Sequence, residues 1–237
     1  RFKIYRSKDK GESWEDLGWG MDTGFTFDGN DFPSDGCPDV FLVWDGKVQK
    51  YLLTYDTSTN DMVTVLANGL AGNEEITAEG EDFATFMKAL NTLTIQLCRT
   101  IAGDGEGATK LLECVVTGAD TLDAAKITAK SVICSSLLKA AMFGADANWG
   151  RVLCAIGYSG ADVDVSKVDV SFRSAKGEIL VCKDGAGVPF SEEIAKEILL
   201  EKEIDILISV GDGPYSASAW GCDLTYDYVK INGDYRT

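Results

Sequence analysis

The sequence predicts a mixed α/β fold in which helices are layered on β-sheets. Strand-like and helix-like segments alternate along residues 56–237, whereas residues 1–55 carry strand and turn signals without a helical pattern. With 45% apolar residues over 237 positions, the chain can bury a large core. No apolar run approaches the roughly 20 residues that a membrane span needs, so we expect no membrane partner.

The first 55 residues predict a β-rich segment whose origin the sequence leaves open. The stretch "VFLVWDGKVQKYLLTY" reads as two strands joined at Asp45-Gly46, a strong hairpin signal. The stretch "SKDKGESW" at 7–14 resembles the Asp-box turn of sialidase-type propellers, which is usually a structural hairpin. We therefore predict a division into a segment 1–55 and a body 56–237.

The body begins with two predicted helices and contains two more. Ser58 or Thr59 would cap the first, which ends near Gly69, and the second covers 81–103 with apolar residues at helical spacing. The other two helices are expected over 120–136, capped by Asp120 or Thr121, and over 191–202, opened by Ser191.

Strands are expected between and after these helices. They cover 110–118, 168–172, 177–185, 204–210 and the tail from Ala219, including a strand through Leu224–Ile231. The tail is dense in tyrosine, aspartate and threonine. We expect it either to be pinned by side-chain hydrogen bonds or to line a site.

Charge and composition exclude several functions. A net charge of −16 repels phosphate backbones, so nucleic acid is not an expected partner. The chain has no histidine, which excludes Ser–His catalysis and histidine-ligated zinc within it, and we predict no metal site. Seven cysteines without a C-x-x-C motif indicate buried reduced thiols and a cytoplasmic location.

Three polar stretches could carry chemistry. In "GDGEGATK" (103–110), glycines let a ligand approach the backbone and the Glu106 carboxylate suits an ammonium group, although a helix C-cap and turn would give the same pattern. In "FGADANWGRV" (143–152), Asp146, Asn148 and Arg151 surround Trp149 in a predicted short loop, where a hydrogen-bonded turn is the alternative. "TYDTSTND" (54–61) could bind an anion at a helix start or simply cap that helix.

Several of these motifs together resemble a known family. Residues 56–237 are similar to the β chain of the bifunctional ornithine acetyltransferase, or glutamate N-acetyltransferase, of arginine biosynthesis. The motifs that carry the resemblance stand in the family's order and at its spacing: "DTSTNDMVTVLANG", "DGEGATK", "SSLLKAAMFGADANWGRV", "WGCDLTYDYVKIN" and "DYRT".

The resemblance implies a two-lobed α/β fold and a ping-pong transfer of acetyl from N-acetylornithine to glutamate. It implies that Glu106, Asn232 and Thr237 bind substrate, so that the end of the chain forms part of the pocket wall. It further implies an α chain cut from the same precursor, an α2β2 assembly and no cofactor, with acetyl-CoA as an alternative acetyl donor.

The first 55 residues depart from the family. Its β chain should begin with a threonine nucleophile, but this chain begins with Arg1, and the contexts of Thr23 and Thr26 do not fit. This segment instead resembles part of a five-bladed propeller glycosidase in which Gly36 replaces the acid/base glutamate. Two alternatives therefore stay open: a non-catalytic homologue that binds amino acids or only folds, and a carbohydrate module built on residues 1–55.

Overall fold

The computed structural model describes residues 3–6, 15–19, 41–44, 50–53 and 76–234, with side chains from 76 to 234. The chain divides into two compact units, Arg1–Thr94 and Ile95–Thr237. This division follows the contacts among residues and does not test where the family-like body begins. The boundary predicted between residues 55 and 56 therefore stays a prediction.

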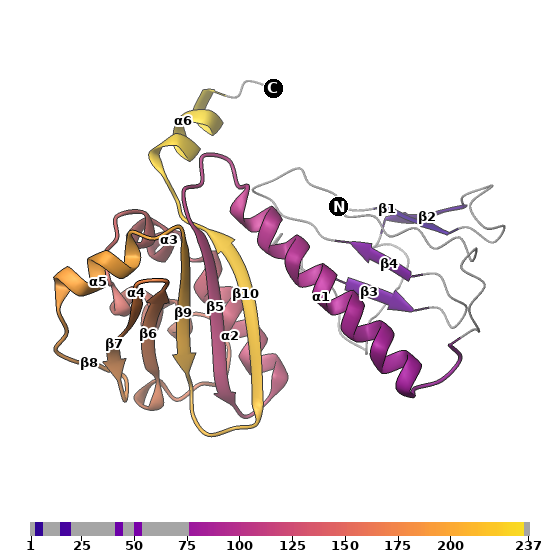
Figure 1. Ribbon diagram of the computed structural model, residues 1–237, viewed down its shortest axis with the longest axis horizontal. Helices are drawn as coiled ribbons and strands as arrows, with labels where there is room; N and C mark the ends of the chain where they lie inside the picture. Colours follow the sequence, from indigo (N-terminus) through magenta and orange to yellow (C-terminus); the bar gives the residue numbers. More distant parts are fainter. Residues whose placement is uncertain (1–2, 7–14, 20–40, 45–49, 54–75, 235–237) are drawn as a thin grey trace. The chain divides into compact units, whose positions relative to one another are not determined.

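The first unit contains two antiparallel strand pairs (Figure 1). Strand β1 (Lys3–Arg6) pairs with β2 (Glu15–Trp19), and β3 (Phe41–Trp44) pairs with β4 (Lys50–Leu53). The antiparallel pairing of β3 with β4 confirms the two strands predicted here, whereas the turn predicted at Asp45-Gly46 lies outside the described residues. The Asp-box at 7–14, Thr23, Thr26, Gly36 and the helix predicted over 58–69 lie outside the described residues.

Helix α1 (Glu81–Gly103) has the limits that its apolar spacing and Gly103 predict, and it crosses the division between the units. Glu81 and Asp82 lie in its first turn, where negative charge favours the helix dipole.

The second unit is built on a six-stranded mixed sheet with the order β10-β5-β9-β6-β7-β8. Strands β5 and β9 run parallel, and every other neighbouring pair is antiparallel. The strands are β5 (Leu111–Ala119), β6 (Asp169–Ser174), β7 (Gly177–Lys183), β8 (Ala186–Gly187), β9 (Glu203–Ser209) and β10 (Tyr215–Cys222).

Two helices lie against strands of this sheet, two more pack against the first of these, and a fifth follows the last strand. The helices are α2 (Leu122–Cys134), α3 (Ser136–Phe143), α4 (Trp149–Gly157), α5 (Glu192–Leu199) and α6 (Tyr226–Asp234), with a short 3₁₀ turn at Val165–Lys167. Figure 1 shows α2 lying behind the sheet and α6 projecting from one of its edges. The caps predicted for α2 and α5 are confirmed: Thr121 accepts a hydrogen bond from the Ala124 N–H at 3.1 Å, and Ser191 accepts one from the Ile194 N–H at 3.3 Å.

The core lies between the sheet and helices α2–α5. Alternate residues of the central strands are buried, such as Leu112, Cys114 and Val116 of β5, and they join one cluster with buried side chains of these helices. This period of two is what a strand with one covered face requires. The mixed α/β class predicted from the sequence is confirmed.

The strand predicted through Leu224–Ile231 is wrong, because the chain turns into helix α6 after β10. Tyrosine, valine and isoleucine in this stretch favour a strand by propensity. Local capping outweighs that preference: the Thr225 hydroxyl accepts the Tyr228 N–H at 3.2 Å, and Asp227 lies in the first turn.

The short loop predicted around Trp149 is also wrong, because Trp149 begins helix α4 and Asn148 caps it. Helix α3 was not predicted, and its first residue fell within the helix predicted over 120–136. Ser135 ends α2 and caps α3, since its hydroxyl accepts the Leu138 N–H. Helices of eight or nine residues show too little periodicity to be separated from their neighbours by pattern alone.

None of the helices within the described residues is long and apolar enough to cross a membrane.

Candidate functional site

Antiparallel pairing brings two distant segments to one edge of the sheet. Strand β5 begins at Leu111 and β10 ends at Cys222, and these two residues pair directly. The loop that precedes β5 (104–110) therefore meets the segment that follows β10 (223–234), as Figure 1 shows for α6 and the start of β5.

Asp223 fastens the first contact between these segments. Its side chain is 3% exposed, and it accepts hydrogen bonds from the backbone N–H groups of Thr109 at 2.8 Å and Lys110 at 3.0 Å. The Thr109 hydroxyl donates to the second carboxylate oxygen at 2.5 Å. A buried carboxylate with three donors is well compensated, so Asp223 serves to hold the loop.

Thr225 fastens the second contact. Its hydroxyl donates to the Gly107 carbonyl oxygen at 2.7 Å and accepts the Tyr228 N–H that begins α6. The side chain is 4% exposed, so both bonds are shielded from water.

Glu106 and Asn232 meet as a result. The Asn232 side-chain amide donates to a Glu106 carboxylate oxygen at 2.9 Å and to the Tyr228 carbonyl at 3.0 Å. Both side chains are exposed, so this pair lies at the surface where a ligand can reach it. Two of the three predicted site residues therefore lie together, whereas Thr237 is outside the described residues. Their role in substrate binding stays a prediction.

Gly107 lets loop 104–110 approach α6 closely. Its φ of +68° belongs to the left-handed region, and a Cβ there would stand 2.8 Å from the Tyr228 backbone nitrogen. Only glycine allows this approach, and the same residue supplies the carbonyl that Thr225 binds.

Lys110 is the last residue of the same loop, and its buried side chain anchors the loop to the protein interior. It is 8% exposed, and its ammonium donates to the carbonyls of Met142 at 2.5 Å, Phe143 at 3.5 Å and Leu199 at 2.7 Å. These carbonyls end α3 and α5, where a positive charge offsets the helix dipoles. Burial lowers the pKa of Lys110, and the charge of Asp223 partly opposes that shift.

The stretch at 143–152 forms a structural cap. Asn148 accepts the Arg151 N–H at 3.2 Å and donates to Asp146 at 3.0 Å, while Arg151 donates to the Leu137 carbonyl at 2.6 Å. The side chain of Trp149 packs closely over Gly187 and against the core. These contacts agree with the hydrogen-bonded alternative considered for this stretch, although the turn leads into a helix. The other polar stretch, 54–61, lies outside the described residues.

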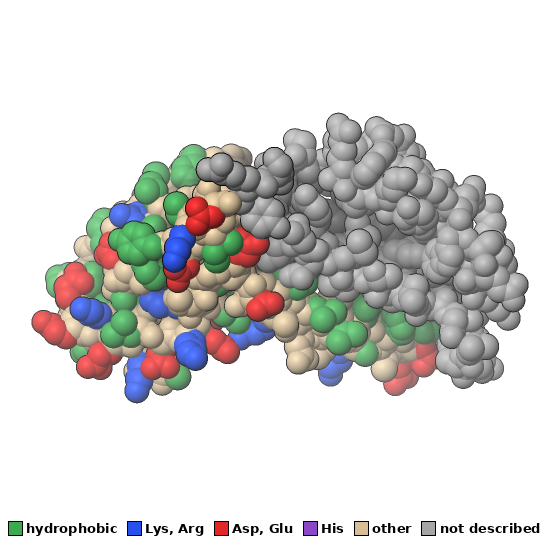
Figure 2. Space-filling view, turned by 90° about the horizontal axis from the view of Figure 1, so that it is seen from above, with side chains coloured by type: hydrophobic (Ala, Val, Ile, Leu, Met, Phe, Trp, Pro, Cys, Tyr) green, Lys and Arg blue, Asp and Glu red, His purple; other side chains and the backbone are tan. Residues whose placement is uncertain are grey.

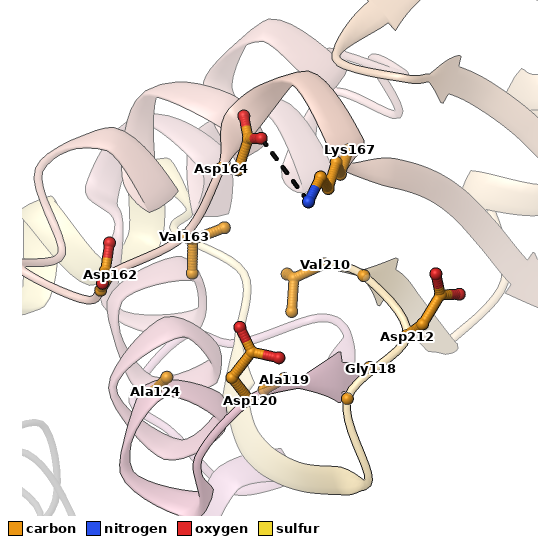
Figure 3. Close-up of a pocket in the computed structure, with 12 residues that line it drawn as sticks. Gly118, Ala119, Asp120, Ala124, Asp162, Val163, Asp164, Lys167, Val210 and Asp212 are labelled. Carbon is orange, nitrogen blue, oxygen red and sulfur yellow. Dashed lines mark ion pairs between the residues drawn. The ribbon is translucent and has the colours of Figure 1, made fainter.

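An acidic hollow of about 310 Å³ lies at the opposite end of β5 (Figure 3). Asp120, Asp162, Asp164 and Asp212 surround it, and Lys167 pairs with Asp164 at 3.9 Å. The pKa of Asp164 is lowered chiefly by the hydrogen bond from the Ser166 hydroxyl. Nine strand residues separate this hollow from the Glu106 loop, a span of about 30 Å. The two are therefore separate features, and we assign no ligand to the hollow.

Charged groups of both signs are mixed with apolar ones on the face of the second unit that Figure 2 shows. Among residues 76–234, no three acidic or cysteine side chains are placed to hold a metal ion.

The prediction of buried reduced thiols is correct for some cysteines and wrong for others. Cys114, Cys182 and Cys222 are buried and lie outside any disulfide, and burial raises the pKa of Cys114 and Cys182. Cys154 is exposed, and Cys134 is exposed and takes part in a disulfide. Apolar neighbours in the sequence indicate a buried helix or strand, but they do not fix which face of it a cysteine occupies.

The structural roles of three residues in this region were not predicted from the sequence: Asp223, Thr225 and Lys110. The signal for Thr225 was present, because a threonine followed two positions later by aspartate is a helix start. Asp223 and Lys110 act over 113 and 32 residues of sequence separation, which no local pattern reports.

Comparisons with known proteins give a consistent result. The ArgJ family model matches residues 53–237. The arginine biosynthesis bifunctional protein ArgJ 1 of Clostridium acetobutylicum is 53% identical over 182 residues, which are 77% of this chain and 45% of that protein. The arginine biosynthesis bifunctional protein ArgJ of Caldanaerobacter subterraneus is 54% identical over 182 residues, which again are 77% of this chain and 45% of that protein.

A solved structure agrees with these matches. The crystal structure of the arginine biosynthesis bifunctional protein ArgJ from Bacillus halodurans superposes with a TM-score of 0.68 at 48% identity, over 76% of this chain and 83% of that one. The present chain spans a little under half the length of the curated relatives it matches.

Proposed function

Because the chain belongs to the ArgJ family over residues 53–237, we propose that it supplies the amino-acid-binding part of an acetyltransferase of arginine biosynthesis. The reaction moves an acetyl group from N-acetylornithine to glutamate. The observation that carries the proposal is the contact between Glu106 and Asn232, which come from segments 126 residues apart.

The pair suits a substrate that carries an ammonium group. Asn232 occupies one carboxylate oxygen of Glu106, and a carboxylate has further lone pairs for a second donor. A substrate ammonium there would form a charge-assisted hydrogen bond, which is stronger than a neutral one. Both amide protons of Asn232 are used, by Glu106 and by the Tyr228 carbonyl, so its side-chain oxygen is the atom left to accept from the ammonium.

We do not assign Asn232 as a donor to the substrate carboxylate. To donate to that carboxylate, Asn232 would have to give up one of its two present bonds. We propose that Thr237, five residues further along, supplies the hydroxyl donor for the carboxylate.

The chemistry proceeds in two balanced steps. A threonine hydroxyl attacks the acetyl carbonyl of N-acetylornithine, the C–N bond breaks, and the ornithine amine leaves with the proton of that hydroxyl. The glutamate amine then attacks the threonine ester, the C–O bond breaks, and the proton returns to the threonine. Within residues 53–237 we assign no nucleophile, so the attacking threonine must be supplied from outside them. This chain's own residues bind and orient the two amino acids.

We propose an α chain as the partner that completes the enzyme, by analogy with the family. Acetyl-CoA is a further acetyl donor to be tested, and no other cofactor is proposed. Cys114 and Cys182 are buried outside any disulfide, which favours a reducing cytoplasmic location, whereas the disulfide of Cys134 favours an oxidising one.

The test is acetyl exchange by this chain combined with an α chain. Labelled acetyl should pass from N-acetylornithine to glutamate, and Glu106→Gln should lower kcat/KM by about 10- to 100-fold because it removes one charge-assisted bond. Glutamine keeps an oxygen for the Asn232 amide, so the local geometry is preserved. Glu192→Gln, on the first turn of α5, is the matched control and should leave the rate unchanged.

The outcomes separate the proposal from its alternatives. Binding of N-acetylornithine without exchange, measured by calorimetry, would favour a non-catalytic homologue. Glycan binding that survives deletion of residues 56–237 would favour a carbohydrate module. Exchange that Glu106→Gln leaves unchanged would remove Glu106 from the site.

A further inference from the structure

We propose that Thr225 is the positioning residue that makes Glu106 and Asn232 one site. The inference rests on the proposed function for the ligand, but its geometric part stands on the contacts alone. Glu106 lies on the loop before β5, and Asn232 lies on the last helix. Neither side chain is buried, so neither is held in place by the core.

The Thr225 hydroxyl is bonded to both segments at once. As donor it binds the Gly107 carbonyl at 2.7 Å, one residue after Glu106. As acceptor it binds the Tyr228 N–H at 3.2 Å and so begins the helix that carries Asn232. A hydroxyl is the smallest group able to do both, and the 4% exposure of this residue keeps water from replacing either bond.

The other contacts of α6 do not replace this link. The helix contains no buried residue, and Tyr226 and Val229 are 82% and 64% exposed. The Tyr226 ring packs edge-on against Phe143 at 5.5 Å, but this contact lies at the first residue of the helix. Asp223 fixes the backbone of 109–110, which lies on the strand side of Glu106. The orientation of Asn232 toward Glu106 therefore depends on the direction in which α6 leaves Thr225.

The close approach at Gly107 limits the size of the side chain that can link the loop to α6. The Gly107 backbone approaches the Tyr228 nitrogen so closely that no side chain fits between loop and helix. A single hydroxyl at 225 can then span the gap, whereas a longer donor would push the two segments apart.

The test compares Thr225→Val with Thr225→Ser. Valine keeps the volume and removes both bonds, while serine keeps both bonds. In the chain combined with an α chain, Thr225→Val should raise the KM for N-acetylornithine at least tenfold and change kcat less than threefold. Thr225→Ser should stay within threefold of the parent in both. A valine variant with unchanged KM overturns the inference.

Thr121→Val is the matched control, since Thr121 caps α2 in the same way at the far end of β5. It should lower the thermal midpoint in the way that loss of a helix cap does, and leave the KM within twofold. A comparable rise of KM in Thr121→Val would show that lost stability, and not positioning, causes the effect, and would also overturn the inference.

Hydrogen exchange on this chain alone separates failure of the inference from failure of the proposed function. Thr225→Val should speed exchange of the amides at 226–234 at least tenfold, Tyr228 included, and leave those of β9 unchanged. If neither form uses N-acetylornithine but this exchange still changes, the proposed function fails and the positioning role stands. Unchanged exchange at 226–234 overturns the positioning role whatever the enzyme does.

Discussion

Replacing Lys110 by methionine should destabilise the second unit by roughly 3 kcal/mol. The substitution keeps the length of the side chain but leaves the carbonyls of Met142 and Leu199 buried without their donor. It also removes the positive charge at the ends of α3 and α5. Urea unfolding, followed by fluorescence, measures the loss. Lys126→Met, on an exposed position of α2, is the matched control and should change stability by less than about 0.5 kcal/mol.

The stability lost in Lys110→Met should increase as the pH rises. The pKa of Lys110 is lowered in the folded state, so between that pKa and the ordinary value of 10.5 the unfolded chain binds more protons than the folded one. Stability therefore increases with pH in this window, because the cost of burying the charge is relieved. The difference between the parent and Lys110→Met should widen from pH 8 to pH 10. A difference that narrows over that range would contradict burial as the dominant effect on this lysine.

Replacing Gly118 by alanine should cost about 3 to 5 kcal/mol, the largest effect we expect from a single methyl group. Gly118 has a φ of +76°, and a Cβ would stand 1.9 Å from the Gly211 carbonyl oxygen. That carbonyl belongs to the backbone, so no side chain can turn aside to make room. The Val210 and Gly213 N–H groups donate to the Thr117 and Gly118 carbonyls, which holds residues 210–213 close to the last residues of β5.

Gly157→Ala provides the comparison for Gly118→Ala. Gly157 ends α4, and nothing lies within 4 Å of a Cβ built there. Alanine should leave stability unchanged or raise it by up to about 1 kcal/mol, since it limits the unfolded chain. Thermal unfolding of both variants measures the contrast. Equal effects at the two glycines would mean that the close approach at Gly118 is not a constraint.

Capping chemistry and the period of apolar residues predicted much of the fold. Helix α1 has its predicted limits, and Thr121 and Ser191 cap the helices that they were expected to cap. The strand predicted over 110–118 is confirmed as β5, a short run rich in apolar and β-branched residues. These are signals within one turn or one strand, where a single sequence carries the information.

The predictions are wrong where contacts between distant parts of the chain determine the secondary structure. Strand propensity indicated a strand through Leu224–Ile231, but Thr225 caps a helix whose position depends on Gly107, 118 residues earlier. Helices α3 and α4 are too short for a periodic signal, and the buried charge of Lys110 stabilises the end of α3 from another element.

The candidate site likewise contains one residue that a local pattern predicts and one that it does not. Glu106 stands out locally, as a carboxylate in a glycine-rich loop. Asn232 in "KING" has no such signal, and only the resemblance to a family singled it out. Their contact depends on the register of β5 with β10, which places Leu111 opposite Cys222. Strand register between segments a hundred residues apart is not readable from one sequence.

A double-mutant cycle on N-acetylornithine binding tests most directly whether Glu106 and Asn232 act as one site. Calorimetry would give the dissociation constants of the parent, Glu106→Gln, Asn232→Ala and the double variant, each combined with an α chain. If both groups hold one ammonium, the second substitution costs much less once the first is present, with a coupling of about 1 kcal/mol or more. Two losses that add within about 0.3 kcal/mol, or no loss in either single variant, would contradict a shared site.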